Sequence, residues 1–453
     1  AGLYCATLLA GKGATARVFE AAERVGGRVQ SLRDVFPGQV AEHGAELIDT
    51  THVTLRGLAG AYGLSLESYA DNKLPGEETF YFDGRHYSEA QVVDEYRAFV
   101  PALREDLSKL SGGATADAYN ETDRRLDFTT LRDYLDQRGA GALIRQVIDV
   151  AYTIEFGREI DRQSALSLLF FIGANRRSSF TPFGVFSDER FHIVEGNDAV
   201  ATGMAANLPV APRLGHRLLR VGKDASGRVK LVFESGGRSV ESTHDAAVIT
   251  LPAPAMRDVE FDASAGLGAD NRLAIAQLDY GTSSKLMIGF RGRPWYERRG
   301  SNGSSYSDLP NHQNTWETNP SRAVAFERGV LTDYSGGNRG ARLDPSRTQS
   351  EAAAFLGDLE KVWPDTTQLA SRDRRGQLVA QLDNWSMKPL FKGGYTNNQP
   401  GYFTTLEGLY AKPAGRLFFA GEHTDSFYSY QGFMEGALLS GARAADEALR
   451  ALA

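Results

Sequence analysis

The chain has 453 residues, a length that suggests two or three domains, each with enough apolar residues for a core. Its 50 lysines and arginines against 57 aspartates and glutamates give a net charge of −7 with no basic run, so neither nucleic acid nor an anionic membrane is an expected partner. The longest apolar stretch, residues 166–174, is far shorter than the roughly 20 residues that span a bilayer. A single cysteine, Cys5, excludes an intrachain disulfide and leaves the compartment, cytoplasmic or exported, undecided.

The opening of the chain has the pattern of a nucleotide-binding βαβ unit without its first strand. Residues 3–13 predict a helix that glycines end, and residues 16–19 predict a strand with Glu20 at its carboxyl end. Gly2 stands where the third glycine of a G-x-G-x-x-G motif would be, and Glu20 lies near the distance expected for a contact with an adenosine ribose. Because the first strand and two glycines are absent, we expect the biological chain to be longer, or a separate fragment to supply the strand.

The region of residues 51–189 is mainly helical in its pattern and more charged than its surroundings. Its helical runs break at residues 112–113 and 139–141, where glycines cluster. Residues 166–174 predict a buried helix within it, because the run is apolar throughout.

Short strands follow the helical region. Successive strands are predicted over residues 217–221, 229–233, 240–242 and 247–251, the last parallel and ended by Pro252. Lys285 precedes an apolar strand over residues 286–290. Residues 308–337 are polar with short strand-like pieces, and residues 350–362 predict an amphipathic helix.

The end of the chain combines a buried strand with a helix that has a small-residue face. Residues 417–420 form an apolar run that Gly421 stops. From Gly432 onward, glycine and alanine recur mostly at spacings of three and four, so another backbone or a flat molecule can lie close to this helix. The unpaired N–H groups at its N-terminus favour an anion or an electron-rich carbonyl there.

Several motifs together resemble the flavin-containing amine oxidase family, which includes monoamine, polyamine and L-amino acid oxidases. The segments are E-A-A-E-R-V-G-G-R at residues 20–28, E-H-G-A-E at 42–46, A-G-E-H-T at 420–424 and G-F-M-E-G-A-L-L-S-G-A-R-A-A at 432–445. The resemblance, to a soluble member of bacterial type, implies an α/β fold with a Rossmann-like, discontinuous FAD-binding domain. That domain would comprise residues 1–50, 190–265 and 410–453, and an α+β substrate domain would combine a helical lobe (51–189) with a mixed sheet (266–409).

The resemblance also implies which residues contact FAD. Arg24 and Arg28 would neutralise the pyrophosphate, and Leu218 would meet the adenine. Gly394 stands where monoamine oxidases carry the cysteine that bonds to the flavin, so we expect non-covalent FAD. The full predicted set is Gly2, Glu20, Ala21, Arg24, Gly27, Arg28, Gly44, Ala45, Glu46, Leu218, Trp385, Gly421, Glu422, Gly432, Phe433 and Met434.

Three residues carry the implied chemistry. Lys285 would hold a water beside the flavin, and Tyr395 and Phe433 would flank the substrate amine with aromatic faces. Phe171 would line the substrate pocket together with Tyr395 and Phe433, although packing in the core is the alternative for each ring. Solvation in a loop or at a strand edge is the corresponding alternative for Arg24, Arg28 and Lys285.

The expected reaction is removal of a hydride from the carbon that bears an amine, with O2 as the final acceptor and H2O2 as a product. A primary amine is favoured, because residues 44–47 read G-A-E-L where L-amino acid oxidases carry a carboxylate-binding arginine in G-A-M-R. The first alternative is an L-amino acid oxidase in which Arg158 or Arg177 replaces that arginine, and the second is a degenerate, non-catalytic flavoprotein. The 8 histidines are scattered without ligand spacing, so no metal is expected, and a homodimer stays open.

Overall fold

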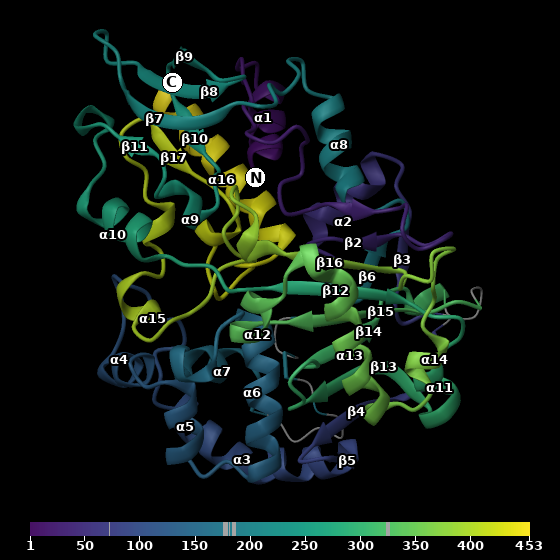
Figure 1. Ribbon diagram of the computed structural model, residues 1–453. Helices are drawn as coiled ribbons and strands as arrows, with labels where there is room; N and C mark the ends of the chain where they lie inside the picture. Colours follow the sequence, from purple (N-terminus) through teal and green to yellow (C-terminus); the bar gives the residue numbers. More distant parts are fainter. Residues whose placement is uncertain (72, 175–179, 181, 184–186, 323–326) are drawn as a thin grey trace.

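The computed structural model of the chain describes residues 1–453 except residues 72, 175–179, 181, 184–186 and 323–326. Figure 1 shows an upper part that contains both chain ends and a lower part built on a large sheet. This mixed α/β arrangement agrees with the predicted fold class. The boundaries of the predicted domains stay a prediction.

The two ends of the chain pack against each other in the upper part (Figure 1). Helix α1 (Gly2–Gly11) lies so close to α16 (Met434–Leu452) that a Cβ atom on Gly441 would be 2.6 Å from the carbonyl oxygen of Ala1. Strand β17 (Leu417–Phe419) pairs in parallel with β10 (Ala247–Ile249). The predicted C-terminal strand and helix are therefore confirmed, and the small residues of α16 are what permit the close approach.

The predicted strand at residues 16–19 is wrong. Only Phe19 forms a bridge, a parallel one to Arg213, with hydrogen bonds of 2.9 Å on either side of it. A strand needs a continuous partner, and the segment at Arg213 pairs at this one position. The strands predicted at 217–221, 229–233 and 240–242 fall within a four-stranded sheet in the order β11 (Glu260–Phe261), β7 (Arg217–Lys223), β8 (Val229–Ser235) and β9 (Arg238–His244).

A seven-stranded sheet forms the centre of the lower part. Its order is β16 (Ala380–Asn384), β12 (Ser284–Gly289), β15 (Val330–Ser335), β14 (Asn314–Glu317), β13 (Ser301–Ser307), β4 (Glu77–Phe82) and β5 (Arg85–Tyr87). The hairpin β4–β5 comes from the region predicted to be mainly helical. Its turn, Asp83 and Gly84, has φ values of 51° and 74°, and an Asp-Gly pair is a sequence signal for such a turn.

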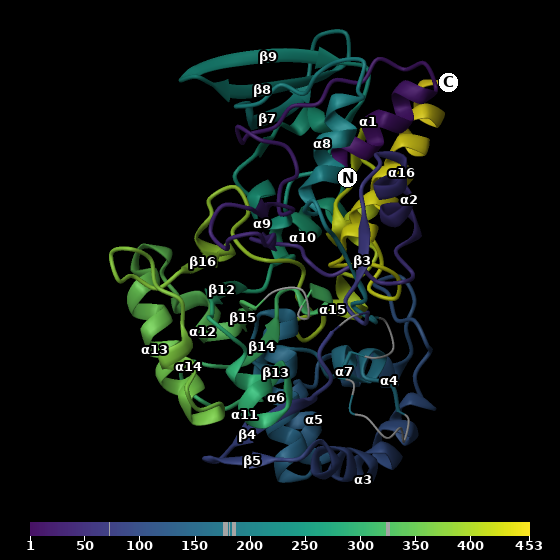
Figure 2. The same cartoon turned by 90° about the vertical axis from the view of Figure 1, so that its right-hand side faces the viewer.

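Helices lie on both sides of this sheet (Figure 2). On one side are α3 (Glu89–Leu107), α4 (Glu121–Asp127), α5 (Leu131–Gln137), α6 (Ala142–Phe156) and α7 (Ala165–Phe171); α7 confirms the predicted buried helix in shorter form. On the other are α11 (Pro294–Arg299), α13 (Thr348–Val362) and α14 (Thr366–Leu369), and α13 confirms the helix predicted at 350–362. No helix among the described residues combines the length and apolarity needed to cross a membrane.

Ten further elements complete the α-helices and strands of the described residues. They are β1 (Ser31–Leu32), β2 (Ala41–Glu42), α2 (Val53–Ala61), β3 (Leu66–Ser68), β6 (Phe191–Ile193), α8 (Asp198–Ala206), α9 (Ala253–Met256), α10 (Ala269–Gln277), α12 (Gly337–Arg342) and α15 (Tyr402–Thr405).

The buried carboxylate of Glu435 ties α16 to α2. It accepts hydrogen bonds of 2.8 Å from the backbone N–H groups of Thr54 and Leu55, which lie in the first turn of α2. No side chain caps α2 at His52, the residue before it, so Glu435 satisfies donors that would otherwise have no partner.

We therefore predict that Glu435→Ala lowers the free energy of unfolding by about 1–3 kcal/mol, because two buried N–H groups lose their acceptor. Denaturant unfolding measures this change. Asp446→Ala, at an exposed position of the same helix, is the control and should change the value little. Equal effects of both substitutions would contradict the capping role.

Candidate active site

A cavity of about 1560 Å³ is lined by the glycine-containing motifs of the two chain ends and by residues of the seven-stranded sheet. It exceeds the roughly 300–1,000 Å³ of an ordinary small-molecule pocket, so it can hold a dinucleotide together with a small substrate. The predicted residues that line it are Gly2, Glu20, Ala21, Gly27, Arg28, Gly44, Ala45, Glu46, Phe171, Leu218, Lys285, Trp385, Tyr395, Gly421, Glu422, Gly432, Phe433 and Met434. Arg24 is the predicted residue that does not.

The residues at one end of the cavity suit a nucleotide. Gly2 begins α1, and a Cβ atom there would lie 3.1 Å from the hydroxyl oxygen of Thr250. The Glu20 carboxylate accepts one hydrogen bond of 2.8 Å, from the backbone N–H of Ala22, and burial raises its pKa. The carboxylate can therefore accept a further hydrogen bond, such as one donated by a ribose hydroxyl.

Two arginines shape the glycine loop between residues 24 and 28. Arg24 donates to the carbonyl oxygens of Val25, Gly27 and Val29 at 2.6–3.2 Å, so it holds the loop rather than facing the cavity. Arg28 donates to the Glu422 carboxylate at 2.8 Å and to the Gly394 carbonyl at 2.6 Å. Neither arginine is therefore a freely solvated loop charge.

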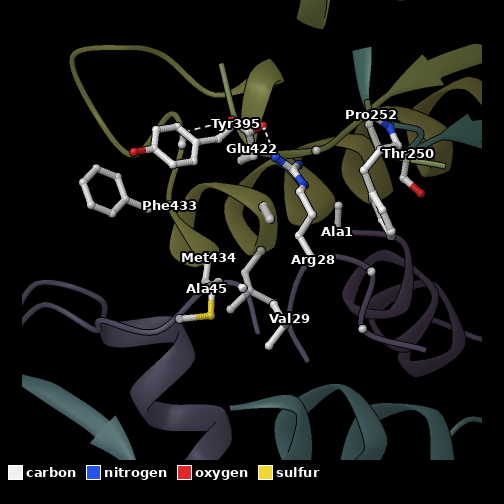
Figure 3. A pocket seen from close by; sticks show the side chains of 18 of the residues that line it. Ala1, Arg28, Val29, Ala45, Thr250, Pro252, Tyr395, Glu422, Phe433 and Met434 are labelled. Carbon is white, nitrogen blue, oxygen red and sulfur yellow. Dashed lines mark hydrogen bonds and ion pairs between the residues drawn. The ribbon is translucent and has the colours of Figure 1, made fainter. Parts of the chain in front are cut away.

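Figure 3 shows the guanidinium of Arg28 directed at Glu422. The other Glu422 oxygen accepts from the backbone N–H of Gly432 at 2.9 Å and from the Thr396 hydroxyl at 3.0 Å. Burial alone would raise the pKa of Glu422, but the charge of Arg28 lowers it overall. The ion pair with Arg28 thus favours the ionised form of Glu422, which anchors the loop before α16.

Lys285 is buried on β12, where its ammonium group meets three acceptors. It donates to the carbonyl oxygens of Gly44 at 2.8 Å and Glu42 at 3.2 Å and forms an ion pair with Glu46. Trp316 donates to the same Glu46 carboxylate at 2.9 Å. Since an ammonium has three donors, a water at Lys285 would have to share or replace one of these acceptors.

Tyr395 and Phe433 lie next to each other at the other end of the cavity (Figure 3). Gly432 has a φ of 89°, which favours glycine, and a Cβ atom on it would lie 3.6 Å from the Tyr395 ring. The Tyr395 hydroxyl donates to the backbone carbonyl of Glu155 and lies 3.4 Å from that of Tyr334. The Phe433 ring packs edge-on against His52 with centroids 5.2 Å apart. Hydrogen bonds and packing thus fix both rings.

The sequence analysis missed several cavity residues. His52, Trp316 and Tyr334 support or line the aromatic end, but they come from segments without a local motif. Burial lowers the pKa of His52 to about 4, so this imidazole is neutral at pH 7. Tyr334 belongs to β15, one of the strand-like pieces predicted within residues 308–337.

Some phenylalanines of the helical region line the cavity, whereas Arg158 of the same region does not. Phe171 and Phe183 line the cavity with ring centroids 5.9 Å apart, whereas Phe170 packs against Phe403 and Tyr428 outside it. Arg158 pairs with Asp279 at 2.9 Å and does not line the cavity. Arg177 lies outside the described residues.

Comparisons with known proteins agree with this arrangement. The sequence model of the family described as flavin containing amine oxidoreductase matches residues 1–449. The chain belongs to this family. Similar curated proteins are the L-amino-acid oxidases of Mus musculus (24% identical, 98% of this chain and 68% of the relative), Bungarus fasciatus (23%, 100% and 85%) and Siganus canaliculatus (25%, 98% and 82%).

Solved structures of the flavin-containing amine oxidoreductases share the fold. Cyclohexylamine oxidase from Brevibacterium oxydans IH-35A superposes with a TM-score of 0.80 at 21% identity, covering 99% of this chain and 96% of the other. Putrescine oxidase bound to putrescine gives a TM-score of 0.80 at 17% identity, with the same coverage. At these identities the structures support the fold alone, whereas the family assignment supports a flavin cofactor and oxidation of an amine or amino acid.

The cavity fits the flavin that membership of the amine oxidoreductase family requires. Its wall offers a carboxylate at Glu20 for hydroxyl donors and a guanidinium at Arg28 for anionic groups. Backbone without side chains at Gly27, Gly421 and Gly432 leaves room for a flat ring system. Among the described residues, no group of histidine, cysteine, aspartate and glutamate could hold a metal ion.

We predict that removing Lys285 alone destabilises the protein more than removing the charges of both Lys285 and Glu46. Lys285→Met should lower the free energy of unfolding by about 3–5 kcal/mol, because it leaves the Glu46 charge buried and unpaired. The double substitution Lys285→Met and Glu46→Gln removes that charge and keeps an acceptor for Trp316, so it should recover part of the loss. Denaturant unfolding of both variants checks this; a double variant less stable than the single one would refute it.

Proposed function

We propose that the protein is an oxidase with non-covalently bound FAD that acts on a primary amine. The observation that carries the proposal is one continuous cavity that joins the nucleotide-type residues around Glu20 to the aromatic pair Tyr395 and Phe433. Bound FAD would accept a hydride from the carbon that bears the amine and pass the electrons to O2, giving H2O2 and an imine, which hydrolyses to an aldehyde and ammonia.

The chain's own residues supply position and a dry environment. The faces of Tyr395 and Phe433 would align the amine and stabilise a cation before it loses its proton. Partly buried Arg28 and buried Lys285 would complement negative charge on the flavin, each held in place by a carboxylate. Both roles depend on residues whose orientation the protein fixes before substrate arrives.

Gly394 supports non-covalent attachment. A Cβ atom on Gly394 would lie 2.5 Å from the hydroxyl oxygen of Ser283, so the space for a side chain at this position is already filled. A cysteine could not stand there without movement of Ser283, the residue before β12.

The absence of an arginine at residue 47 and the pairing of two cavity cations favour an amine over an amino acid. Leu47 stands where a carboxylate-binding arginine is typical of L-amino acid oxidases. Arg28 and Lys285, which line the cavity, already pair with Glu422 and Glu46. Oxidation of an amino acid is the second candidate, since the curated relatives that match nearly the whole chain are named L-amino-acid oxidases.

We expect the purified protein to be yellow, to lose its colour when an amine is added without oxygen, and to release FAD on acid precipitation. A peroxide assay over a panel of primary amines and neutral L-amino acids should give the higher kcat/KM with an amine. Faster turnover of amino acids would select the second candidate, and colourless protein that takes up no FAD would indicate a non-catalytic member of the family.

Tyr395→Ala should lower kcat/KM for the amine by roughly 10- to 100-fold while the flavin stays bound, because one of the two aromatic walls is removed. Tyr395→Phe is the matched control, since it keeps the ring and removes only the hydroxyl. Flavin absorbance and steady-state kinetics measure both variants. Loss of flavin from Tyr395→Ala would show that the ring serves the fold instead.

A further inference from the structure

Three carboxylates form an acidic wall in the part of the cavity that adjoins Tyr395. Glu155 belongs to α6, Glu189 precedes β6 and Glu78 belongs to β4, and all three line the cavity. The backbone carbonyl of Glu155 accepts the Tyr395 hydrogen bond, which places this wall beside the aromatic pair. Elements far apart in the sequence thus bring three acids to one space.

No ion pair formed by the described residues includes a carboxylate of this wall; Lys73, which also lines the cavity, acts on Glu78 only through its charge. The carboxylates of Glu155 and Glu189 make no hydrogen bond or ion pair there, and Glu78 receives one long bond of 3.3 Å from Ser304. One oxygen of Glu78 is buried without a partner. The carboxylate oxygens of Glu155 retain accessible surface, and Glu155 lines the cavity.

The other buried acids of this cavity are satisfied. Glu46 pairs with Lys285, Glu422 with Arg28 at 2.8 Å, and Glu317 with Arg293 at 2.6 Å. The acids of the wall differ from these three in that they are more exposed, Glu189 most of all, and in that no ion pair of the described residues includes them. A carboxylate that lines a cavity without an ion-pair partner leaves its charge for a ligand to compensate.

The electrostatics agree with this contrast. Burial, followed by the charge of Asp49, raises the pKa of Glu155 to about 7, and burial with the charges of Glu155 and other acids raises that of Glu189 to about 8. Burial also raises the pKa of Glu78 to about 7. Glu189 is nevertheless an exposed residue that lines the cavity. A cation among these groups would stabilise their ionised forms.

We propose that the acidic wall binds a second ammonium group of the substrate, so that the preferred substrate is a diamine or polyamine. This inference rests on the proposed amine oxidase function. One amine would lie between Tyr395 and Phe433, and the distant ammonium would lie among Glu78, Glu155 and Glu189, with Tyr306 and Tyr334 on the same wall. A substrate carboxylate would be repelled there.

Paired substrates test the proposal. We expect the kcat/KM of the best α,ω-diaminoalkane of three to eight carbons to exceed that of the 1-aminoalkane of equal length by roughly 10- to 100-fold. Glu189→Gln and Glu155→Gln should each remove most of this preference, because KM for the diamine should rise much more than KM for the monoamine. Glu77→Gln, an exposed position on the same strand as Glu78, is the control and should keep the preference.

A binding measurement separates this proposal from the proposed oxidase function. Calorimetric titration of the diaminoalkane into dithionite-reduced protein, which cannot turn over, should show binding that weakens about tenfold or more in Glu189→Gln. This titration also reports on protein that proves to hold no flavin or to oxidise no amine.

Three outcomes would overturn the inference. They are equal kcat/KM for diamines and monoamines, an equal loss for both in Glu189→Gln, and a preference for neutral amino acids. The second outcome would mean that these carboxylates serve the reacting amine or the fold rather than a distant ammonium.

Discussion

The ion pair between Arg28 and Glu422 holds the site together. These residues are 394 positions apart in the sequence, and their contact joins the opening segment of the chain to the loop before α16. Arg28 also reaches the Gly394 carbonyl, and Glu422 reaches Gly432 and Thr396, so four segments meet at one pair of charges. Each charge offsets the desolvation of the other, which makes loss of either one costly to this whole region.

The site could be predicted where function imposes a local pattern on the sequence. The glycines at residues 421, 432 and 436 and the segment around Arg28 mark backbone that must pass close to another group, and such spacing is readable in one chain. The acidic wall could not be predicted, because Glu78, Glu155 and Glu189 come from three elements with no shared motif. Their proximity is a product of the tertiary fold.

The errors in the predicted secondary structure have similar causes. The strand predicted at residues 16–19 failed because strand formation depends on a partner that the local sequence does not reveal. The hairpin β4–β5 was missed although Asp83 and Gly84 carry a turn signal, because the charged surroundings of the helical region outweighed it. Helices with strong periodicity, such as α13, were correct to within two residues at each end.

The position of Phe433 has a consequence for specificity. This residue precedes α16, whose Glu435 holds the first turn of α2, and His52 at the start of α2 packs on the Phe433 ring. The aromatic end of the cavity is therefore clamped from outside by a peripheral helix. A substitution that shifts α2 would therefore move Phe433 and could admit a bulkier substrate, although no residue that lines the cavity is replaced.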